Sequence, residues 1–205
     1  MKPFTTLTAV AVPFDMANCD TDKLIPARLL RKPRDPSYAP YLFHDMRFDS
    51  EGRGRPEFVL NLPPYRNAGI LVAGANFGCG SSREGAVYAL LDYGIRAVIA
   101  PSFGDIHYAN EIQNGMLPAI VSEDVSRKLR EQLHAQPGAR ITIELDSQAI
   151  TGPDGARHSF DIEASYKERL LKGIDDVDLV LQYLPQIEAW EERYRSDMPW
   201  RASRG

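Results

Sequence analysis

The segment 74–84 combines residue types and spacings that could do chemistry. It reads Gly-Ala-Asn-Phe-Gly-Cys-Gly-Ser-Ser-Arg-Glu and follows an apolar run at 69–73 that predicts a buried strand. Its glycines allow the backbone to turn sharply and to approach a ligand. We expect Ser81 to begin a helix, with Glu84 at the spacing of a capping box. Free N–H groups, two hydroxyls and Arg83 at a helix N-terminus predict a site for a carboxylate or phosphate.

The common ligand-binding motifs do not account for this segment. It lacks the Gly-x-x-x-x-Gly-Lys-Ser/Thr phosphate loop, the dinucleotide pattern Gly-x-Gly-x-x-Gly and the nucleophile elbow Gly-x-Ser-x-Gly. A glycine-rich turn between a strand and a helix can also be purely structural, with Ser81 acting only as the N-cap. Taken alone, the segment leaves both interpretations open.

Four ordered segments carry a more specific resemblance. Residues 78–84 resemble the Gly-x-Gly-Ser-Ser-Arg-Glu signature of the swivelling domain in the aconitase superfamily. Residues 18–26 (Asn-Cys-Asp-Thr-Asp-Lys-Leu-Ile-Pro), 42–48 (Leu-Phe-His-Asp-Met-Arg-Phe) and 100–118 are similar to segments of 3-isopropylmalate dehydratase small subunits. The resemblance is close over residues 6–121, and the remainder fits in length and pattern.

The resemblance implies an α/β fold of the swivelling β/β/α type, with a mixed sheet, flanking helices and a C-terminal helical tail. It implies one small-subunit domain over 1–205, with a core at about 1–165 and a tail at about 166–205. The implied activity is that of a hydro-lyase, which isomerises 2-isopropylmalate to 3-isopropylmalate through 2-isopropylmaleate in leucine biosynthesis.

The same resemblance assigns roles to the residues of the loop. Ser81 matches the family's catalytic serine, which takes a proton from a carbon beside a carboxylate. A serine hydroxyl is a weak base, so nearby N–H groups and a cation must stabilise its alkoxide. Ser82 and Arg83 are expected to bind a substrate carboxylate, and the planar guanidinium of Arg83 suits bidentate contact.

A second set of residues concerns substrate choice. In the resembled family a loop after the Asn-x-Asp-Thr-Asp segment helps to select the side chain of the substrate. Leu29, Leu30 and Arg31 are the candidates here. For Arg31, together with Lys32 and Arg34, a solvated cluster of charges is an equal alternative.

The sequence departs from the family pattern directly after Glu84. The family usually has His-Ala-Pro-Trp there, whereas residues 85–88 are Gly-Ala-Val-Tyr. The substrate is therefore left open among small di- or tricarboxylates. A paralogous hydro-lyase of the dimethylmalate, citraconate/methylmalate or homoaconitate type is one alternative. A non-catalytic module that binds carboxylates is another.

The cysteine count argues against an iron–sulfur cluster on this chain. A cluster needs three or four thiolates, and the sequence has only Cys19 and Cys79. The 4 histidines lack the spacing of metal ligands, so no metal site is predicted. The resemblance implies that a [4Fe-4S] cluster lies on a separate large subunit and that this chain is active only with that partner. Cys79 is either a reactive thiol near a helix N-terminus or a packed small side chain.

Charge and composition argue against two other kinds of binding partner. Net charge is −4, and no apolar run approaches the length of about 20 residues that spans a bilayer. We therefore expect neither nucleic-acid nor membrane binding. The N-terminus lacks the pattern of a secretory signal, and the expected location is the cytoplasm.

The remaining pattern predicts alternating strands and helices, followed by a β-rich portion and a helical tail. Asp20, Thr21 and Asp22 lack the Gly and Glu of a calcium loop, and we expect them to cap a turn. The predicted elements are strands at 95–100 and 119–121, helices at 105–114 and 122–135, alternating strands at 139–162 and helix from 165 to 195.

Overall fold

A computed structural model describes residues 1–35, 38–80, 83–198 and 200 of the chain. The chain divides into two compact units, Met1–Gly173 and Ile174–Gly205. The first unit contains the sheet and all of the described residues around the segment 74–84. The two units are described separately.

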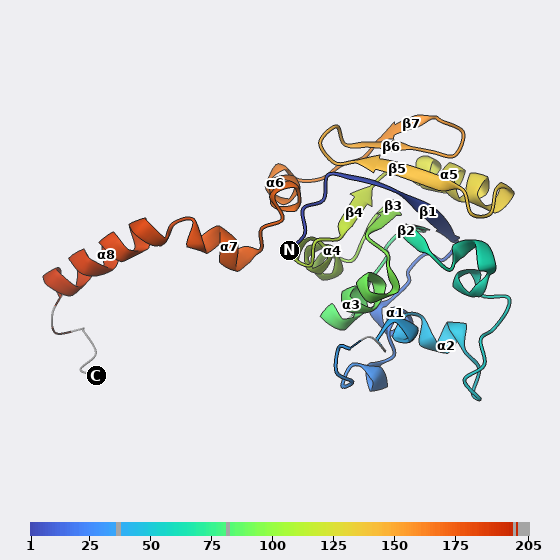
Figure 1. The fold of residues 1–205 in the computed structure, drawn as a ribbon, viewed down its shortest axis with the longest axis horizontal. Helices are drawn as coiled ribbons and strands as arrows, with labels where there is room; N and C mark the ends of the chain where they lie inside the picture. The colour runs from blue at the N-terminus through green and yellow to red at the C-terminus, as the bar shows by residue number, and fades with distance from the viewer. Residues whose placement is uncertain (36–37, 81–82, 199, 201–205) are drawn as a thin grey trace. The chain divides into compact units, whose positions relative to one another are not determined.

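A seven-stranded mixed sheet forms the frame of the first unit, in the order β4-β3-β2-β1-β5-β6-β7 (Figure 1). Four strands run parallel: β1 (Thr6–Phe14), β2 (Ala68–Ala73), β3 (Ala97–Ala100) and β4 (Leu117–Ile120). Three continue the sheet in antiparallel pairing: β5 (Arg140–Glu144), β6 (Ala149–Thr151) and β7 (Arg157–Ser159). Because β1 to β4 run parallel, their carboxyl ends meet at one edge of the sheet, where ligands commonly bind.

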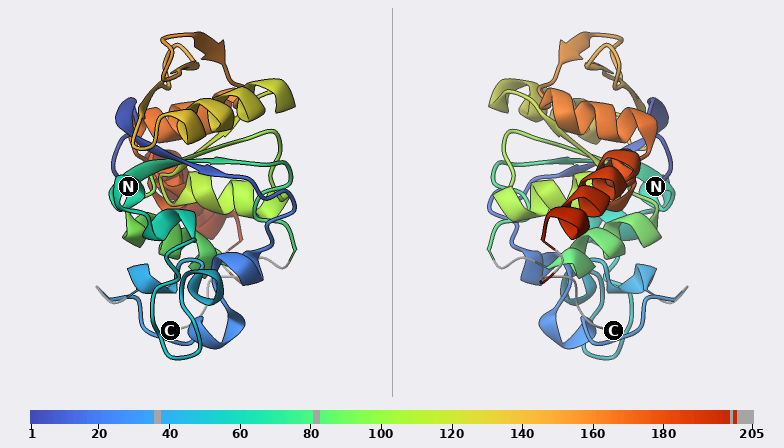
Figure 2. Two further views of the ribbon diagram at one scale, coloured as in Figure 1. Left: turned by 90° about the vertical axis from the view of Figure 1, so that its right-hand side faces the viewer. Right: turned by 90° about the vertical axis from the view of Figure 1, so that its left-hand side faces the viewer.

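Both faces of the sheet are covered, which explains why β2 and β3 consist entirely of buried residues. One face carries α3 (Glu84–Tyr93) and the long connection between β1 and β2. The other carries α5 (Glu123–Ala135) and α6 (Ala164–Lys172), and Figure 2 shows α5 and α3 on opposite sides of the strands. The predicted helix after Ser122 is confirmed, since the Ser122 hydroxyl caps α5.

The connection between β1 and β2 contains only short helical elements, in agreement with its irregular sequence pattern. They are α1 (Thr21–Leu24), η1 (Ala27–Leu29), η2 (Ala39–Tyr41), α2 (His44–Arg47), η3 (Val59–Asn61) and η4 (Pro63–Tyr65). Aromatic packing fixes this connection to the sheet, because the Phe43 ring lies 4.8 Å from the ring of Phe14 on β1. A predicted cap is confirmed at α1, where the Asp20 carboxylate accepts from the Lys23 N–H at 2.9 Å.

The helical tail is interrupted rather than continuous. Gly173 ends α6 in the left-handed conformation (φ +67°), which glycine adopts readily. The second unit then contains α7 (Asp176–Leu181), opened by a capping box between Asp175 and Asp178, and α8 (Leu184–Asp197). No described residue of this unit is buried. None of the described helices in either unit is long and apolar enough to cross a bilayer.

Candidate active site

Loops from three neighbouring strands meet at the carboxyl edge of the sheet. The loop after β2 contains residues 74–80 and lies between the loop after β1 and the loop after β3. On one side, the Phe77 N–H donates to the Ser102 carbonyl at 3.0 Å. On the other, the Gly78 N–H donates to the Cys19 carbonyl at 2.8 Å. The backbone leading to Ser81 is therefore fixed from both sides.

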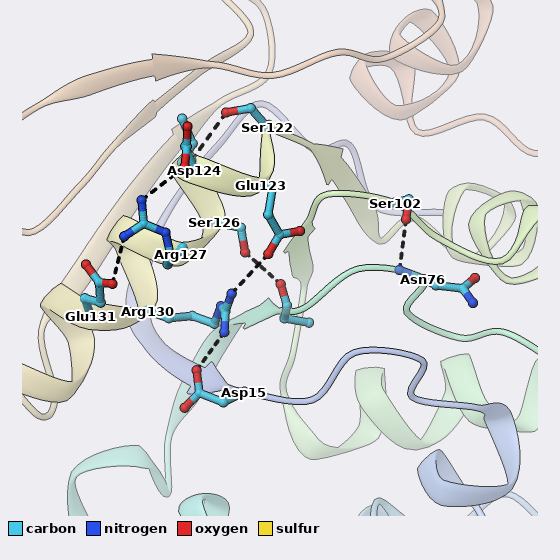
Figure 3. A network of polar contacts seen from close by, with 12 residues as sticks. Asp15, Asn76, Ser102, Ser122, Glu123, Asp124, Ser126, Arg127, Arg130 and Glu131 are labelled. Atoms are coloured by element: carbon cyan, nitrogen blue, oxygen red, sulfur yellow. Dashed lines mark hydrogen bonds and ion pairs between the residues drawn. The ribbon is translucent and has the colours of Figure 1, made fainter.

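Side chains and α5 secure the same strand ends. Asn76 adopts the left-handed conformation (φ 59°), its N–H donates to Ser102 Oγ at 2.9 Å, and its Nδ2 donates to Asn18 Oδ1 at 2.8 Å. Figure 3 shows the Asn76–Ser102 contact, and it also shows Ser126 of α5 donating to the Ala73 carbonyl at 2.8 Å. These bonds satisfy backbone groups that the strand end leaves unpaired.

Close packing against α4 (Asp105–Gln113) dictates the glycine at position 78. Gly78 has φ +69°, and a Cβ atom there would lie 2.1 Å from Cδ2 of His107. Gly104, which precedes α4, has the reciprocal constraint, since its Cβ would lie 2.6 Å from the Gly78 carbonyl oxygen. The backbone of the turn at Gly78 is thus in direct contact with the His107 ring and with the backbone of Gly104.

A pocket of about 320 Å³ opens beside this turn. Its lining combines the turn with the start of α4: Asn76, Gly78, Cys79, Gly80, Phe103, Gly104, Asp105, Ile106 and His107. Gly80 is the last described residue before Ser81, and it is part of this lining.

Of the residues predicted to act in the loop, only Arg83 is described, because Ser81 and Ser82 lie outside the described residues. Arg83 has extended backbone angles and is the N-cap of α3. The prediction that the helix begins at Ser81 with a capping box is wrong, since α3 begins at Glu84. The Glu84 carboxylate instead accepts from Nδ2 of Asn114 at 3.0 Å, which ties α3 to α4.

The guanidinium of Arg83 already binds a carboxylate. Its Nη1 contacts Oδ1 of Asp22, which comes from the loop after β1. The Arg83 side chain is 18% exposed, whereas that of Asp22 is 58% exposed. The arginine is therefore held in place, while its present partner stands at the surface.

The predicted specificity residues are brought only partly to the site. Leu30 packs on the first turn of α3, because a Cβ at Gly85 would lie 2.7 Å from Leu30 Cδ2 and 2.9 Å from the hydroxyl oxygen of Tyr38. Leu29 is half-buried at the end of η1, and Arg31 is exposed. Leu30 is thus next to the residues that follow Arg83.

Arg34 is exposed, as are Arg31 and Lys32, but its guanidinium is also paired with α3. Its Nε and Nη2 each donate to the Asp92 carboxylate at 2.9 Å, and its guanidinium lies 4.1 Å from the centre of the Tyr88 ring. Asp92 and Tyr88 both belong to α3. A bidentate pair with a cation–π contact anchors the 30–34 region to that helix.

The two cysteines differ in environment. Cys19 is fully buried, and burial raises the pKa of its thiol to about 12, so it remains protonated. Cys79 is half-buried and lines the pocket. Among the described residues, no group of three or more His, Cys, Asp or Glu side chains could hold a metal ion.

Sequence reasoning missed three residues that the structure places at this edge. Asp22 pairs with Arg83 across 61 positions of the chain, which no local pattern could indicate. His107 and Glu111 form a buried pair on α4, with Nε2 2.9 Å from Oε1. Their i,i+4 spacing within a predicted helix was a readable signal that they share one face.

The mixed sheet, with a glycine-rich loop before a helix at its carboxyl edge, defines an aconitase-type swivelling domain. The family model for the aconitase C-terminal domain matches residues 1–124, and a model described as LeuD_N matches residues 127–164. The chain belongs to the family of 3-isopropylmalate dehydratase small subunits.

Relatives with that name support the assignment over the full length. The small subunit of Jannaschia sp. is 47% identical over 98% of this chain and 100% of its own. That of Rhodospirillum centenum is 48% identical, with 98% of each chain covered. A crystal structure of 3-isopropylmalate dehydratase from Methanocaldococcus jannaschii superposes with a TM-score of 0.64 at 28% identity, covering 92% of this chain and 99% of that one. The family, the fold and the hydro-lyase class predicted from sequence are confirmed.

Proposed function

We propose that this chain is the subunit that closes the active site of an enzyme isomerising 2-isopropylmalate to 3-isopropylmalate, through 2-isopropylmaleate, in leucine biosynthesis. The observation that carries the proposal is the turn at 74–80, which is bonded on both sides and ends directly before Ser81. Similarity to small subunits of this dehydratase along the whole chain supports it.

Ser81 is the proposed base. Moving a hydroxyl between neighbouring carbons requires loss of water across the C–C bond and its return in the opposite sense. The base takes a proton from the carbon beside a carboxylate and later returns one. Gly80, the last described residue before Ser81, has φ +88°, a conformation that glycine adopts without strain. Nearby N–H groups and the charge of Arg83 would stabilise the alkoxide.

Arg83 and Ser82 are the proposed carboxylate-binding residues. The contact between the Arg83 guanidinium and the Asp22 carboxylate supports this role. A substrate carboxylate can replace the exposed Asp22 without leaving a buried arginine unpaired, which keeps the cost of exchange low. Asp22 would then act as an internal stand-in for substrate while the site is empty.

Leu29 and Leu30 are the proposed contacts for the alkyl group of the substrate, with Arg31 at the exposed rim. Leu30 lies against Gly85, on the turn of α3 that follows Arg83. An apolar side chain at this place would favour an isopropyl group over a polar substituent.

The proposed partner is a large subunit that carries the [4Fe-4S] cluster and acts in the cytoplasm. That cluster would supply the Lewis acid that helps the substrate hydroxyl to leave. We assign this contact to large exposed apolar side chains of the second unit: Val177, Leu179, Val180, Leu181, Tyr183, Leu184 and Trp190. Exposed apolar residues in this density are typical of a protein interface.

Gly85 favours a second candidate, a paralogous hydro-lyase acting on dimethylmalate, citraconate/methylmalate or homoaconitate. A glycine there admits Leu30 and Tyr38 to the space of a side chain, which changes the walls beside the proposed substrate site. The difference would alter which alkyl group fits rather than the reaction itself.

Reconstitution with a cluster-loaded large subunit tests these proposals. We expect kcat/KM to be highest for 2-isopropylmalate, and Ser81→Ala to lower kcat by about 10³-fold. Ser147→Ala is the control, because Ser147 is exposed in the turn between β5 and β6, and it should retain full activity. Higher kcat/KM on another malate would support the paralogue. Malate binding without turnover by any complex would indicate a non-catalytic binding module.

A further inference from the structure

A buried ionisable pair lies directly beneath the proposed catalytic turn. His107 is 2% exposed and Glu111 is fully buried, and both belong to α4. The His107 ring contacts Gly78 from below and packs edge-on against Phe77, with 5.6 Å between ring centroids. His107 also lines the pocket beside the turn. The pair thus connects the interior of the domain with the wall of the site.

The pair is costly for the fold. Apart from their mutual contact, Nδ1 of His107 and Oε2 of Glu111 have no hydrogen-bond partner among the described residues. Burial raises the pKa of Glu111, and the contact with His107 opposes this only in part. Apolar side chains of similar volume would fill the same space at lower cost. A costly ionisable pair beside a cleft is typical of a functional site.

The charge of the pair depends on how many protons it holds. With Glu111 ionised and His107 neutral, the pair carries one negative charge beneath the pocket. One further proton removes that charge. Because malates bind as carboxylate anions, the negative state opposes their binding through the low-dielectric interior, where charges are poorly screened.

Several other titratable groups lie near the pair and the pocket. Tyr108 on α4 stays neutral, because burial, and then Tyr166, Glu111 and Glu163, raise its pKa to about 12. The Glu84 carboxylate on α3 accepts from Asn114, which lies three residues after Glu111 on the chain. The remaining groups at the pocket are Cys79 in the turn and Asp105 at the start of α4.

We propose that His107 and Glu111 are positioning residues that support the turn at Gly78 and make substrate binding strongest when the pair holds the further proton that removes its negative charge. The proposal rests on the proposed function, since it takes the substrate to bind at the end of the turn at 74–80, within range of the charge of the pair. KM should therefore rise with pH, while kcat changes little.

Steady-state kinetics of the reconstituted enzyme between about pH 6 and about pH 9 tests the proposal. In the wild type we expect KM for 2-isopropylmalate to rise roughly tenfold across this range. Glu111→Gln keeps the shape and a hydrogen-bonding group but removes the charge, so KM should vary less than about twofold. The control Glu168→Gln, at the surface of α6, should follow the wild-type curve.

A double variant separates this role from packing. His107→Phe with Glu111→Leu should keep or raise the melting temperature, because an apolar pair replaces a buried ionic one, while flattening the KM profile. If both variants retain the wild-type pH profile, or if the wild-type KM does not change with pH, the inference is overturned. Loss of stability in the double variant with an unchanged profile would assign the pair to packing alone. No turnover by the wild-type complex would instead overturn the proposed function, and the inference with it.

Discussion

The turn at 74–80 and the second unit, Ile174–Gly205, differ in how tightly their residues are packed. The turn is bonded on both sides, and a Cβ atom added at Gly74 or Gly78 would lie 2.1 to 2.9 Å from neighbouring atoms. In the second unit no described residue is buried, and large apolar side chains such as Trp190, 53% exposed, face solvent. The turn is fixed by contacts within the first unit, whereas the second unit, taken by itself, has no buried residue among those described.

The difference fits the division of roles that we propose for an active site completed by a large subunit. Residues that must hold a substrate need fixed positions, which the sheet edge supplies before any partner arrives. Residues that bind a partner gain their stabilisation only on contact. The following variants test whether the two regions are separate in this sense.

Deleting the second unit should produce the largest effect on assembly and little on folding. A chain ending at Gly173 keeps the bond from the Phe4 N–H to the Leu170 carbonyl at 2.8 Å, which closes the first unit. We expect affinity for the large subunit to fall at least about 100-fold, since aromatic and aliphatic anchors dominate interfaces. The free energy of unfolding should change by less than about 1 kcal/mol. Binding calorimetry measures the affinity, and urea unfolding measures the stability. Full activity of the truncated chain with the large subunit would contradict a role of the second unit in assembly.

Gly78→Ala should damage the turn itself. The new Cβ would lie 2.1 Å from the His107 ring, and the alanine would have to keep the left-handed backbone conformation of Gly78. We therefore expect the free energy of unfolding to fall by about 2–4 kcal/mol and kcat to drop strongly. Gly155→Ala is the matched control. Its φ is +81°, but no described atom lies within 4 Å of the new Cβ, so the cost should be only about 1 kcal/mol. Equal losses in the two variants would show that contact with α4 is unimportant.

Gly85→Ala should have a moderate effect confined to substrate choice. The Cβ would meet the flexible end of Leu30 at 2.7 Å, which can move, and alanine gains about 1 kcal/mol of helix propensity. We expect near-normal stability and a roughly threefold change in the ratio of kcat/KM between malates that differ in alkyl size. A uniform loss on all malates would argue against a role of Leu30 in selection.

The ion pair between Arg28 and Asp45 should contribute least. Arg28 and, to a lesser extent, His44 lower the pKa of Asp45 to about 2. A carboxyl with a lowered pKa in the folded state adds stability above its unfolded pKa, near 4, and loses it as pH falls through about 2. Because the pair is at the surface, Asp45→Asn should cost below about 1 kcal/mol at pH 7 and markedly less at pH 2, where the carboxyl is about half protonated. A loss that persists at pH 2 would point to packing instead.

Sequence patterns predicted much of the frame because the signals involved are local. An apolar run became β2, and Ser122 capped the helix that its spacing predicted. The helix start at Ser81 was wrong because Arg83 adopts extended angles and Glu84 bonds to Asn114, 30 residues away. Local propensity cannot register such a competing tertiary contact.

The candidate site shows the same limit. The loop at 78–84 was found from its residue types, and its neighbours were found only from the fold. Asp22 reaches Arg83, and His107 reaches Gly78, through the adjacency of parallel strands whose ends are far apart in sequence. Their roles depend on register and on the depth of burial, which the sequence pattern does not specify.

Strand β1 pairs with β2 on one side and with β5 on the other, so the N-terminal strand needs residues 140–144 to complete its ladder. During translation, this ribbon of unpaired backbone must wait for about 130 further residues, on the order of 10 seconds at typical elongation rates. Such delayed closure makes folding slow and leaves nascent chains prone to mispairing. We therefore expect chaperones to bind this chain while it is nascent, before it assembles with any partner.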